Sequence, residues 1–469
     1  MTKATLAVII GNRDFFPDRL VTEARADILK LFKEMDIEPV ILDDNATKLG
    51  GVETWTHAKI CAELFKKNAG RIDGILVVLP NFGDEKGVAD TVKLSGLNVP
   101  ILVQAYPDDL NQLTVERRRD GFCGKISVCN NLRQYGYAYS LTGLHTVHPL
   151  SDSFRADLTK FVGVCRVVKG LKNARFGAIG ARPGNFNTMR YSEKMLQSFG
   201  ISIMTVDFSE LLGKAGKLSD DDSRVKDKLA AIKGYAKHDS VPSLALVRMA
   251  KLGVVIDEWM KEYDLTASAI QCWTSLQQNY HINVCTLMSM MSEHLMPSAC
   301  EVDITGVASM YALQLASGSP SALVDWNNNY GGDPDKCVLF HCGNWAKSFL
   351  PDIEIKNAEI LATTLGTENT YGAVAGRVPA GPMTFARIST DDTQGIIRTY
   401  VGEGLFTDDP LETFGARAVV QVPGLQKLMH HICKNGFEHH CAMNASRAAA
   451  ILAKSFETYF GWGVYYHIG

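Results

Sequence analysis

Short apolar runs alternate with amphipathic stretches through the start of the chain, and this alternation constrains the fold more than any other feature. Four runs have the composition of buried strands, at 5–10, 39–44, 74–80 and 99–105. The segments between them carry apolar residues at helical spacing, as in LVTEARADILKLFKEM. Such alternation predicts a doubly wound parallel sheet, because parallel strands need a crossover helix between them.

The same pattern resumes after about residue 172 and later gives way to a different texture. A second set of apolar runs lies at 174–180, 201–207 and 267–273. After about residue 345 the chain becomes strand-rich with glycine punctuation, as in TYGAVAGRVPAGPMTFARIS. This part predicts a small barrel or sandwich, closed by helices around 423–435 and 444–458.

The expected fold class is therefore α/β, with two consecutive Rossmann-like (doubly wound) domains followed by a β-rich, barrel-like C-terminal domain. The 469 residues allow two to four domains at roughly 100–200 residues each. We place the domains at 1–168, 169–347 and 348–469.

Composition limits the class of partner and the compartment. The formal charge is −3, which disfavours a nucleic-acid binder, since such proteins usually carry a basic face. The start, MTKATLAVIIGNRD, predicts neither a membrane span nor a signal peptide. Eleven cysteines occur without a CxxC pair, which favours reduced thiols in a cytoplasm.

Polar side chains follow successive apolar runs in the second half of the chain. Glu301 precedes a helical run, Asp325 follows the run ALV, and His341 follows VLF. The pair His439–His440 lies further on, in GFEHHCAMN. Each residue also has an ordinary explanation. An early carboxylate such as Glu301 suits a helix N-terminus, and a polar residue at a strand end is common where the chain leaves the sheet. Together they offer mixed oxygen and nitrogen ligands of the kind that suit Mn²⁺, Fe²⁺, Co²⁺ or Zn²⁺.

Seven blocks resemble those of the L-fucose isomerase and L-arabinose isomerase superfamily. They are GARPGNFNTMRYSEK, AIQCWTSLQ, ACEVDITG, ALVDWNN, LFHCGN, GRVPAGPMTFARIS and HHCAMN, in this order along the chain. The resemblance implies that Glu301 and Asp325 are both catalytic and metal-binding. It also implies a third metal ligand from the C-terminal domain, His440, with His439 as the alternative within the doublet.

The resemblance further implies a set of substrate-binding residues. They are Arg13, Lys125, His341, Asn344 and His439. Arg13 would contact a sugar bound in a neighbouring subunit, although a solvated loop arginine is an equal alternative. Lys125 belongs to GFCGK, which the family places near the site, and His341 would hold a substrate hydroxyl or support the metal ligands.

The function implied is a metal-dependent aldose–ketose isomerase that acts through a cis-enediol between paired carboxylates. Mn²⁺ is the expected ion, with Co²⁺ or Mg²⁺ as alternatives. The substrate would be a deoxyhexose, a pentose or a C6-anionic hexose such as sulfoquinovose. A closed homo-oligomer (trimer, tetramer or hexamer) is expected, without nucleic-acid or membrane partners. A sugar-binding or regulatory protein and a metal-dependent epimerase stay open as alternatives.

Overall fold

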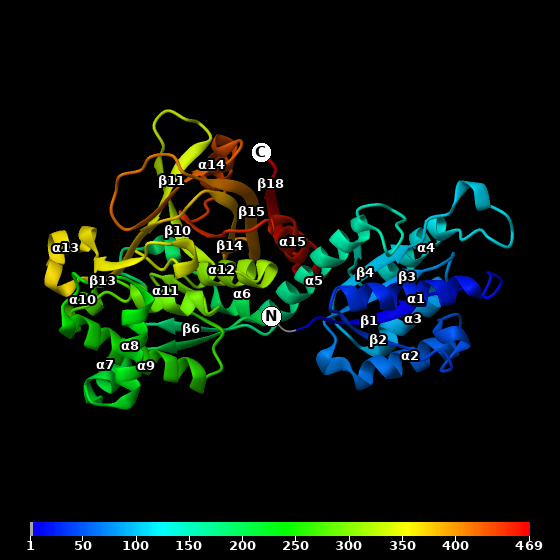
Figure 1. Ribbon diagram of the computed structural model, residues 1–469, viewed down its shortest axis with the longest axis horizontal. Helices are drawn as coiled ribbons and strands as arrows, with labels where there is room; N and C mark the ends of the chain where they lie inside the picture. The colour runs from blue at the N-terminus through cyan, green and yellow to red at the C-terminus, as the bar shows by residue number, and fades with distance from the viewer. Residues whose placement is uncertain (1–2) are drawn as a thin grey trace. The chain divides into compact units, whose positions relative to one another are not determined.

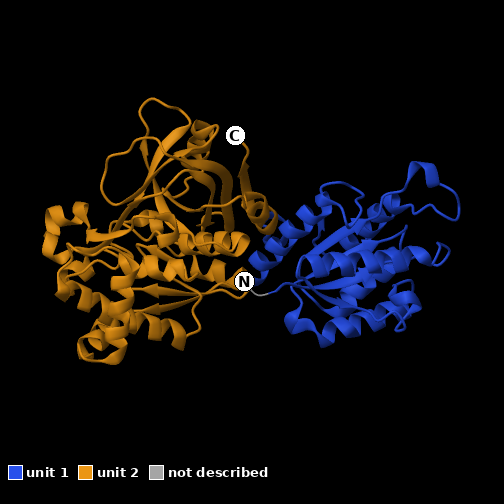
Figure 2. Ribbon diagram, in the orientation of Figure 1, with its two compact units in different colours: residues 1–169, 457–461 blue, residues 170–456, 462–469 orange. Residues whose placement is uncertain are grey.

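The computed structural model describes residues 3–469 (Figure 1). By contacts, these residues form two compact units, drawn in different colours in Figure 2. Unit 1 runs to Lys169 and also includes Glu457–Gly461, and unit 2 comprises Gly170–Phe456 and Trp462–Gly469. No helix within residues 3–469 has the length and apolar character needed to cross a membrane.

Unit 1 is built on a five-stranded parallel sheet with the strand order β2-β1-β3-β4-β5. Its strands are β1 (Thr5–Ile10), β2 (Glu38–Ile41), β3 (Gly74–Leu79), β4 (Ile101–Ala105) and β5 (Ser140–Leu141). Its helices are α1 (Arg19–Glu34), α2 (Trp55–Lys67), α3 (Glu85–Ser95), α4 (Gly121–Gln134) and α5 (Asp152–Lys172), whose end is counted with unit 2.

Helices cover both faces of this sheet because successive strand residues point to opposite sides. In β1, Leu6 and Val8 pack into a core with residues of α1 and α5, whereas Ala7 and Ile9 pack with residues of α2, α3 and α4. Both faces of the central strands β1 and β3 are therefore buried, which explains why their sequences, TLAVII and GILVVL, are almost entirely apolar.

Unit 1 is completed by a segment from near the end of the chain. The hydroxyl of Tyr459 lies 2.8 Å from the Ser140 hydroxyl and donates a hydrogen bond of 3.1 Å to the Ile101 carbonyl. Ser140 and Tyr459 are 319 positions apart in the sequence. The edge of the unit 1 sheet beside β4 and β5 is thus closed by a late part of the chain.

Unit 2 contains a second parallel sheet, with the order β7-β6-β8-β9. Its strands are β6 (Arg175–Ile179), β7 (Ser202–Val206), β8 (Ala267–Ile270) and β9 (Ser298–Cys300). The helices of this part are α6 (Glu193–Ser198), α7 (Phe208–Lys217), α8 (Ser223–Tyr235), α9 (Ser243–Glu262), α10 (Ser275–Asn279), α11 (Cys285–Glu293) and α12 (Ile304–Ser317).

The rest of unit 2 is a nine-stranded mixed sheet, ordered β12-β13-β16-β11-β10-β17-β14-β15-β18, in which β15 also pairs with β16. The strands are β10 (Ala322–Asn329), β11 (Lys336–His341), β12 (Glu354–Asn357), β13 (Tyr371–Arg377), β14 (Gly381–Asp391), β15 (Ile396–Thr407), β16 (Ala416–Gln421), β17 (His440–Asn444) and β18 (Gly463–His467). Helices α13 (Glu359–Leu365), α14 (Leu425–Lys434) and α15 (Ala449–Lys454) accompany it.

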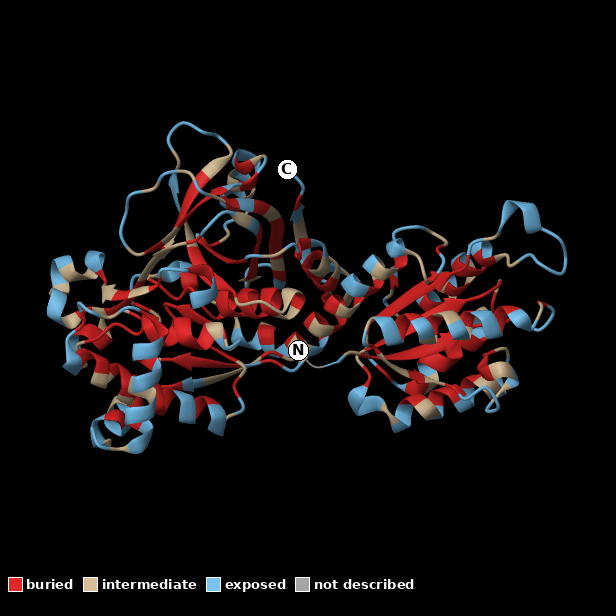
Figure 3. Cartoon of the chain, viewed as in Figure 1, coloured by how far each residue is buried: buried red, intermediate tan, exposed pale blue. Residues whose placement is uncertain are grey.

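Helix α12 packs against both sheets of unit 2. It contacts β8 and β9 of the parallel sheet and β14 and β17 of the mixed sheet. Its residues are buried on nearly every side, as Figure 3 illustrates, and the sequence ITGVASMYALQLAS carries no charge. A helix that is apolar all round is typically enclosed in this way. Gly318, with φ of 75°, ends the helix in a left-handed cap.

The α/β class with parallel sheets is confirmed, as is a large β-rich part toward the C-terminus. The barrel-like closure and the three-domain division stay predictions. Strands β10 and β11, which precede residue 347, lie in the same sheet as strands that follow residue 348. The site described next is built where that sheet faces the carboxyl ends of β8 and β9.

Candidate functional site

Glu301 lies at the end of a parallel strand, in a turn with an unusual backbone. It follows β9 directly, and both Glu301 and Val302 are left-handed, with φ of 54° and 56°. This region is unfavourable for residues other than glycine, particularly β-branched ones, and typically costs about 1–3 kcal/mol each. Hydrogen bonds from the Val302 N–H to the Ile270 carbonyl (3.4 Å) and from the Asp303 N–H to the Cys300 carbonyl (2.9 Å) hold the turn.

Three further polar side chains come from neighbouring strands of the mixed sheet. Asp325 lies within β10, opposite His440 at the start of β17. Residues directly opposite each other on adjacent strands present their side chains to the same face. His341 is the last residue of β11, on the other side of β10. The expected strand before Asp325 continues through it to Asn329, with an irregularity between Trp326 and Asn328.

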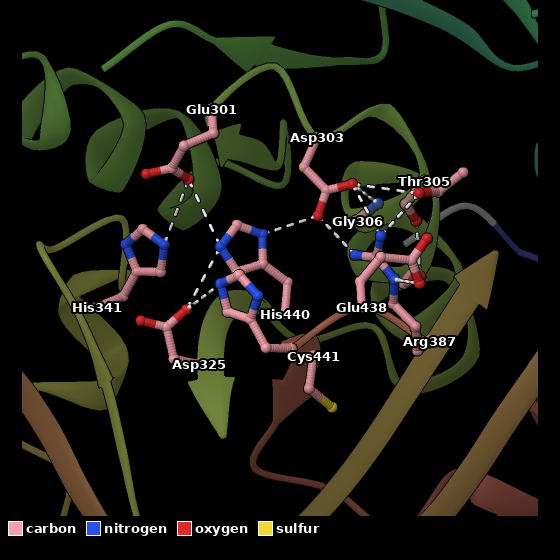
Figure 4. Close-up of polar contacts among 12 residues, drawn as sticks. Glu301, Asp303, Thr305, Gly306, Asp325, His341, Arg387, Glu438, His440 and Cys441 are labelled. Atoms are coloured by element: carbon pink, nitrogen blue, oxygen red, sulfur yellow. Dashed lines mark hydrogen bonds and ion pairs between the residues drawn. The ribbon is translucent and has the colours of Figure 1, made fainter. Parts of the chain in front are cut away.

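These side chains converge with Glu301, as Figure 4 shows. The Nε2 atom of His440 lies 3.6 Å from Glu301 Oε2 and 3.4 Å from Asp325 Oδ1. The Nε2 atom of His341 lies 3.5 Å from the same Glu301 oxygen. Glu301, His341 and His440 are all at most 5% exposed, so these groups meet away from bulk solvent.

A buried ion network lies behind His440 (Figure 4). Asp303 accepts a hydrogen bond of 2.9 Å from His440 Nδ1, and its two oxygens accept bonds of 2.5 and 3.1 Å from Arg387. Arg387 in turn donates a bond of 3.1 Å to Glu438. Arg387 and Asp303 are fully buried, and a buried charge of this kind needs partners on every side. The network therefore fixes the position of His440 from behind.

The hydrogen bonds assign opposite tautomers to the two buried histidines. His440 donates from Nδ1 to the carboxylate of Asp303, so its Nε2 presents a lone pair to Glu301 and Asp325. In His341, Nδ1 accepts a bond of 3.0 Å from the Cys342 N–H, so its proton lies on Nε2 and faces Glu301. His440 is thus suited to bind a cation, and His341 to donate a hydrogen bond.

The electrostatics keep both central carboxylates ionised. Burial alone would raise the pKa of Asp303, but Arg387 and His440 hold that pKa well below its usual range. Burial likewise opposes ionisation of Glu301, yet His341 and His440 hold its pKa below the ordinary value. Burial and the neighbouring His440 lower the pKa of His439. Burial would lower the pKa of His341, but Cys342 and Glu301 raise that pKa well above its ordinary value. Glu301 and Asp303 are therefore ionised carboxylates rather than protonated acids.

The residues fit a divalent cation. Among residues 3–469, Glu301 Oε2 and Asp325 Oδ1 are buried acceptors with no hydrogen-bond donor, and both face the His440 lone pair. Three acceptor atoms that face one another repel unless a cation lies between them. Ligands held at about 2.1 Å from one ion lie about 3 Å apart, close to the observed spacing. Asp325, His341 and His440 also form a group with ligand atoms within 4.8 Å of one another.

A pocket of about 300 Å³ opens beside these groups, at the lower end of the range for small-molecule sites. The carboxylates and the histidines line one side of it. Phe186 and Trp273 line it too, with ring centroids 5.7 Å apart, and Phe186 lies edge-on to His439 at 5.5 Å. Trp273 Nε1 donates a bond of 2.9 Å to Glu301 Oε1. The aromatic wall therefore also orients the carboxylate.

Two sequence profiles match the chain at its two ends. That of the fucose/sulfoquinovose isomerase N-terminal domain matches residues 7–172, and that of the L-fucose isomerase C-terminal domain matches residues 339–467. The chain belongs to the L-fucose isomerase-like superfamily. The resemblance inferred from the seven sequence blocks is confirmed.

Curated members of this superfamily match the chain over most of its length. The sulfoquinovose isomerase of Clostridium sp. (strain MSTE9) is 24% identical over 338 residues, which cover 69% of this chain and 71% of that protein. The sulfoquinovose isomerase of Priestia megaterium is 23% identical over 331 residues, covering 70% and 71%. A solved ABC transporter periplasmic solute-binding protein from Actinobacillus succinogenes, with bound D-allose, aligns with 57% of this chain and 78% of its own at 10% identity. Its TM-score of 0.16 is too low to carry an argument.

Of the site residues that the superfamily resemblance implied, five lie together in unit 2. Glu301, Asp325, His341, His439 and His440 all line the pocket. Within the doublet, His440 is 1% exposed and bonded to Asp303, whereas the His439 side chain is 42% exposed and lies 3.5 Å from Asp325. Their roles as ligands and catalysts stay predictions.

The other three implied residues lie elsewhere. Asn344 is fully buried, donates a bond of 3.2 Å to the Ser298 carbonyl and is not among the pocket-lining residues. Arg13 and Lys125 belong to unit 1. Arg13 pairs with Glu85 and bonds the Gly83 carbonyl at 2.9 Å. Lys125 is buried and donates bonds of 2.6 Å to Thr142 and 2.8 Å to the His145 carbonyl.

Four residues of the site, namely Asp303, Arg387, Glu438 and Phe186, were not predicted from the sequence. Asp303 has the sequence position of a helix cap, and it does cap α12 by accepting a bond of 2.7 Å from the Gly306 N–H. For Arg387 and Glu438 a signal exists, because an arginine within the apolar strand MTFARIS indicates a buried ion pair. Phe186 lies in the block GARPGNFNTMRYSEK, where nothing in the sequence marks an aromatic side chain as part of a site.

Proposed function

We propose that this chain is a metal-dependent aldose–ketose isomerase that acts through a cis-enediol between Glu301 and Asp325. The aldose–ketose isomerase class rests on membership of the superfamily and on the isomerase relatives. The metal and the mechanism rest on one observation. Two buried carboxylate oxygens without donors face the lone pair of an imidazole whose other nitrogen is bonded to Asp303.

Glu301, Asp325 and His440 would hold the ion, for which Mn²⁺ is proposed because carboxylate oxygens suit it, with Co²⁺ or Mg²⁺ as alternatives. When bound, such an ion acts as a Lewis acid that makes the C–H next to the sugar carbonyl more acidic. Asp303 keeps the proton of His440 on Nδ1, so that Nε2 remains available as a ligand.

The two carboxylates would move the proton. One takes it from the substrate carbon next to the carbonyl, and a carboxyl group returns a proton to the neighbouring carbon. Each such group typically contributes about 10²–10⁴-fold to the rate. Trp273 and Cys272 hold Glu301 Oε1 with bonds of 2.9 and 3.2 Å, which leaves Oε2 directed at the site. His341 would donate from Nε2 to Glu301 or to a substrate hydroxyl.

Among the three substrate classes left open by the sequence, we favour a C6-anionic hexose such as sulfoquinovose. The curated relatives are named sulfoquinovose isomerases. A basic side chain, Lys356, lines the pocket and lies 3.1 Å from Glu354, where an anionic group could replace that partner. Within residues 3–469, a second basic side chain, Arg182, bonds the carbonyls of Pro183 and Gly184 and the Asn187 side chain, all in its own loop.

We also propose a closed homo-oligomer in a reducing, cytoplasmic setting. All eleven cysteines, which lie within the described residues, are free thiols, as expected where glutathione keeps thiols reduced. Arg13 would reach a sugar bound in a neighbouring copy and Lys125 would lie in a loop near a site, as the superfamily implies. Apart from further copies of the chain, the proposed partner is a small-molecule sugar.

The test is to incubate the purified chain with Mn²⁺ in D₂O and each of sulfoquinovose, fucose and arabinose, remove the metal, and record proton NMR spectra. A ketose that carries deuterium at C1 is the expected product, formed fastest from sulfoquinovose. Deuterium at C2 without ketose would indicate the epimerase. Metal binding without exchange in any of the sugars would favour the sugar-binding protein instead. A Glu301→Gln sample run in parallel controls for contaminating isomerase.

A further inference from the structure

Four cysteine side chains converge near Glu301, and one of them, Cys272, donates a bond of 3.2 Å to Glu301 Oε1. The Sγ atoms of Cys272, Cys300 and Cys342 all lie within 4.8 Å of one another. The Sγ atom of Cys285 lies 3.5 Å from that of Cys342. The sulfurs come from four separate elements, namely the ends of β8, β9 and β11 and the first residue of α11.

Ordinary packing does not account for this gathering. A single buried cysteine behaves as a small apolar side chain, and the isolated Cys61 in unit 1 is of that kind. Four thiols from four elements that meet at one point are different, because apolar packing has no reason to bring sulfur to sulfur. In a chain without disulfides among its described residues, such a cluster is more often metal-binding than structural.

A second observation comes from a neighbouring amide. Asn283 is fully buried, and among residues 3–469 its Nδ2 finds no hydrogen-bond partner. Its Oδ1 accepts bonds of 2.9 Å from Cys285 Sγ and of 3.3 Å from the Cys285 N–H. Asn283 therefore holds the first residue of α11 and its sulfur in place beside the cluster.

Access to the cluster is also present. Cys272, Cys285 and Cys300 are fully buried, but Cys342 is half-buried and lines the same pocket as the carboxylates. An ion that enters the pocket therefore reaches one sulfur directly. The Cys272 and Cys300 sulfurs lie within 4.8 Å of that atom, and the Cys285 sulfur lies 3.5 Å from it.

We propose that Cys272, Cys285, Cys300 and Cys342 form a second metal site, specific for a soft, thiophilic cation such as Zn²⁺ or Cd²⁺. Thiolates select such ions, whereas Mn²⁺ and Mg²⁺ prefer oxygen and nitrogen. Each thiol that becomes a ligand releases its proton to solvent. Sulfurs bound at about 2.3 Å around one tetrahedral ion lie roughly 3.8 Å apart. The Cys285–Cys342 contact is 3.5 Å, and Cys272, Cys300 and Cys342 lie within 4.8 Å of one another, so binding would draw the four sulfurs onto one ion.

Glu301 would contact both metal sites. Glu301 turns Oε2 toward His440 and accepts a bond of 3.2 Å on Oε1 from Cys272. Occupation of the thiol cluster removes that proton and withdraws the bond from Glu301. The inference itself does not depend on the isomerase chemistry, because thiol ligation can be read without turnover.

The experiment is a Cd²⁺ titration of the fully reduced, full-length chain in excess Mn²⁺, followed by the ultraviolet sulfur-to-cadmium charge-transfer band. We expect one equivalent to saturate the band. Cys285→Ser and Cys342→Ser should each abolish it or weaken Cd²⁺ binding by at least about tenfold. Cys61→Ser, which also alters a fully buried cysteine, should leave it unchanged. A band that survives both Cys285→Ser and Cys342→Ser would overturn the proposal.

A measurement on the unaltered chain covers the case in which a variant misfolds. X-ray absorption of the protein loaded with one equivalent of Cd²⁺ should give a ligand sphere dominated by sulfur. A sphere of oxygen and nitrogen, or no uptake of Cd²⁺ by the reduced chain, would overturn the proposal. A sulfur sphere together with an absence of isomerase turnover would count against the proposed function alone.

Discussion

The Nδ1 atom of His440 lies 2.9 Å from Oδ2 of Asp303, and this bond decides which edge of the imidazole is available to a ligand.

Asp303→Asn should weaken Mn²⁺ binding and turnover by about 10–100-fold, as is typical when the outer partner of a metal-binding histidine is removed. Asparagine can still cap α12 through Oδ1, but its NH₂ group would face the donors of His440 and Arg387. Mn²⁺ affinity, followed by electron paramagnetic resonance, and kcat are the measurements. Asp207→Asn, which alters the exposed cap of α7, is the matched control and should behave as the unaltered chain.

His440→Gln and His439→Gln should differ sharply. The buried His440 faces both carboxylates, so its loss should reduce Mn²⁺ affinity by more than about 100-fold, beyond the usual cost of an outer-shell change. The exposed His439 should affect KM for the sugar more than the affinity for the metal. Equal losses of Mn²⁺ binding in the two variants would contradict the assignment of His440 as the ligand.

Glu301→Gln should reduce kcat by about 10²–10⁴-fold, the usual contribution of a general acid or base, while the fold is retained. The amide has nearly the same shape and can still accept the bond from Trp273. Deuterium incorporation and circular dichroism are measured side by side. Retained exchange at C1 would remove Glu301 from the proposed proton transfer.

Trp273→Phe should lower kcat by about tenfold to a hundredfold, because a hydrogen bond to a charged group is worth about 1.5–3 kcal/mol. The change deletes the N–H that holds Glu301 Oε1 and keeps most of the apolar wall. Trp345→Phe is the matched control, since the Nε1 of this buried tryptophan finds no partner among the described residues. Similar losses in both variants would indicate a packing effect rather than an effect on Glu301.

Acid should destabilise unit 2 through Asp303. Its pKa in the folded chain lies below the ordinary value of 3.8, so only the unfolded chain takes up this proton just below pH 3.8. The contribution is therefore fully present above that pH, and the free energy of unfolding falls as the pH drops further. Asp303→Asn should show a shallower fall between about pH 5 and about pH 3.

Urea unfolding followed by tryptophan fluorescence provides this measurement, because five of the six tryptophans lie in unit 2. Asp392→Asn, which alters an exposed site on the loop after β14, is the control. Its free energy of unfolding should fall with pH as steeply as that of the unaltered chain. If the free energy of unfolding of Asp303→Asn fell with pH as steeply as that of the unaltered chain, the Asp303–Arg387 pair would not determine the loss of stability in acid.

The sequence predicted the parallel part of the fold well, for a physical reason. A strand buried on both faces must be apolar throughout, so TLAVII could be assigned from composition alone, and it is β1 (Thr5–Ile10) residue for residue. Asp325 was harder to place, because its strand continues through polar residues to Asn329 on the mixed sheet. A half-exposed strand end has no continuous apolar signal.

For the site, the sequence supplied the residues that face the pocket, and it missed those behind them. Glu301, Asp325 and His440 belong to recognisable blocks and end close together. Asp303 could not be distinguished from a helix cap, since one of its oxygens is in fact a cap. Its second role depends on Arg387, a partner 84 positions away, and such pairing is set by the tertiary fold.

The segment Glu457–Gly461 has a consequence for how the polypeptide matures on the ribosome. Tyr459 completes the edge of unit 1 at Ser140, yet it is synthesised 319 residues later. The N-terminal sheet therefore lacks the Tyr459 hydroxyl, which contacts Ser140 and the Ile101 carbonyl, until most of unit 2 has been translated. Its consolidation therefore follows the synthesis of residues 170–456, although its own strands are made before them.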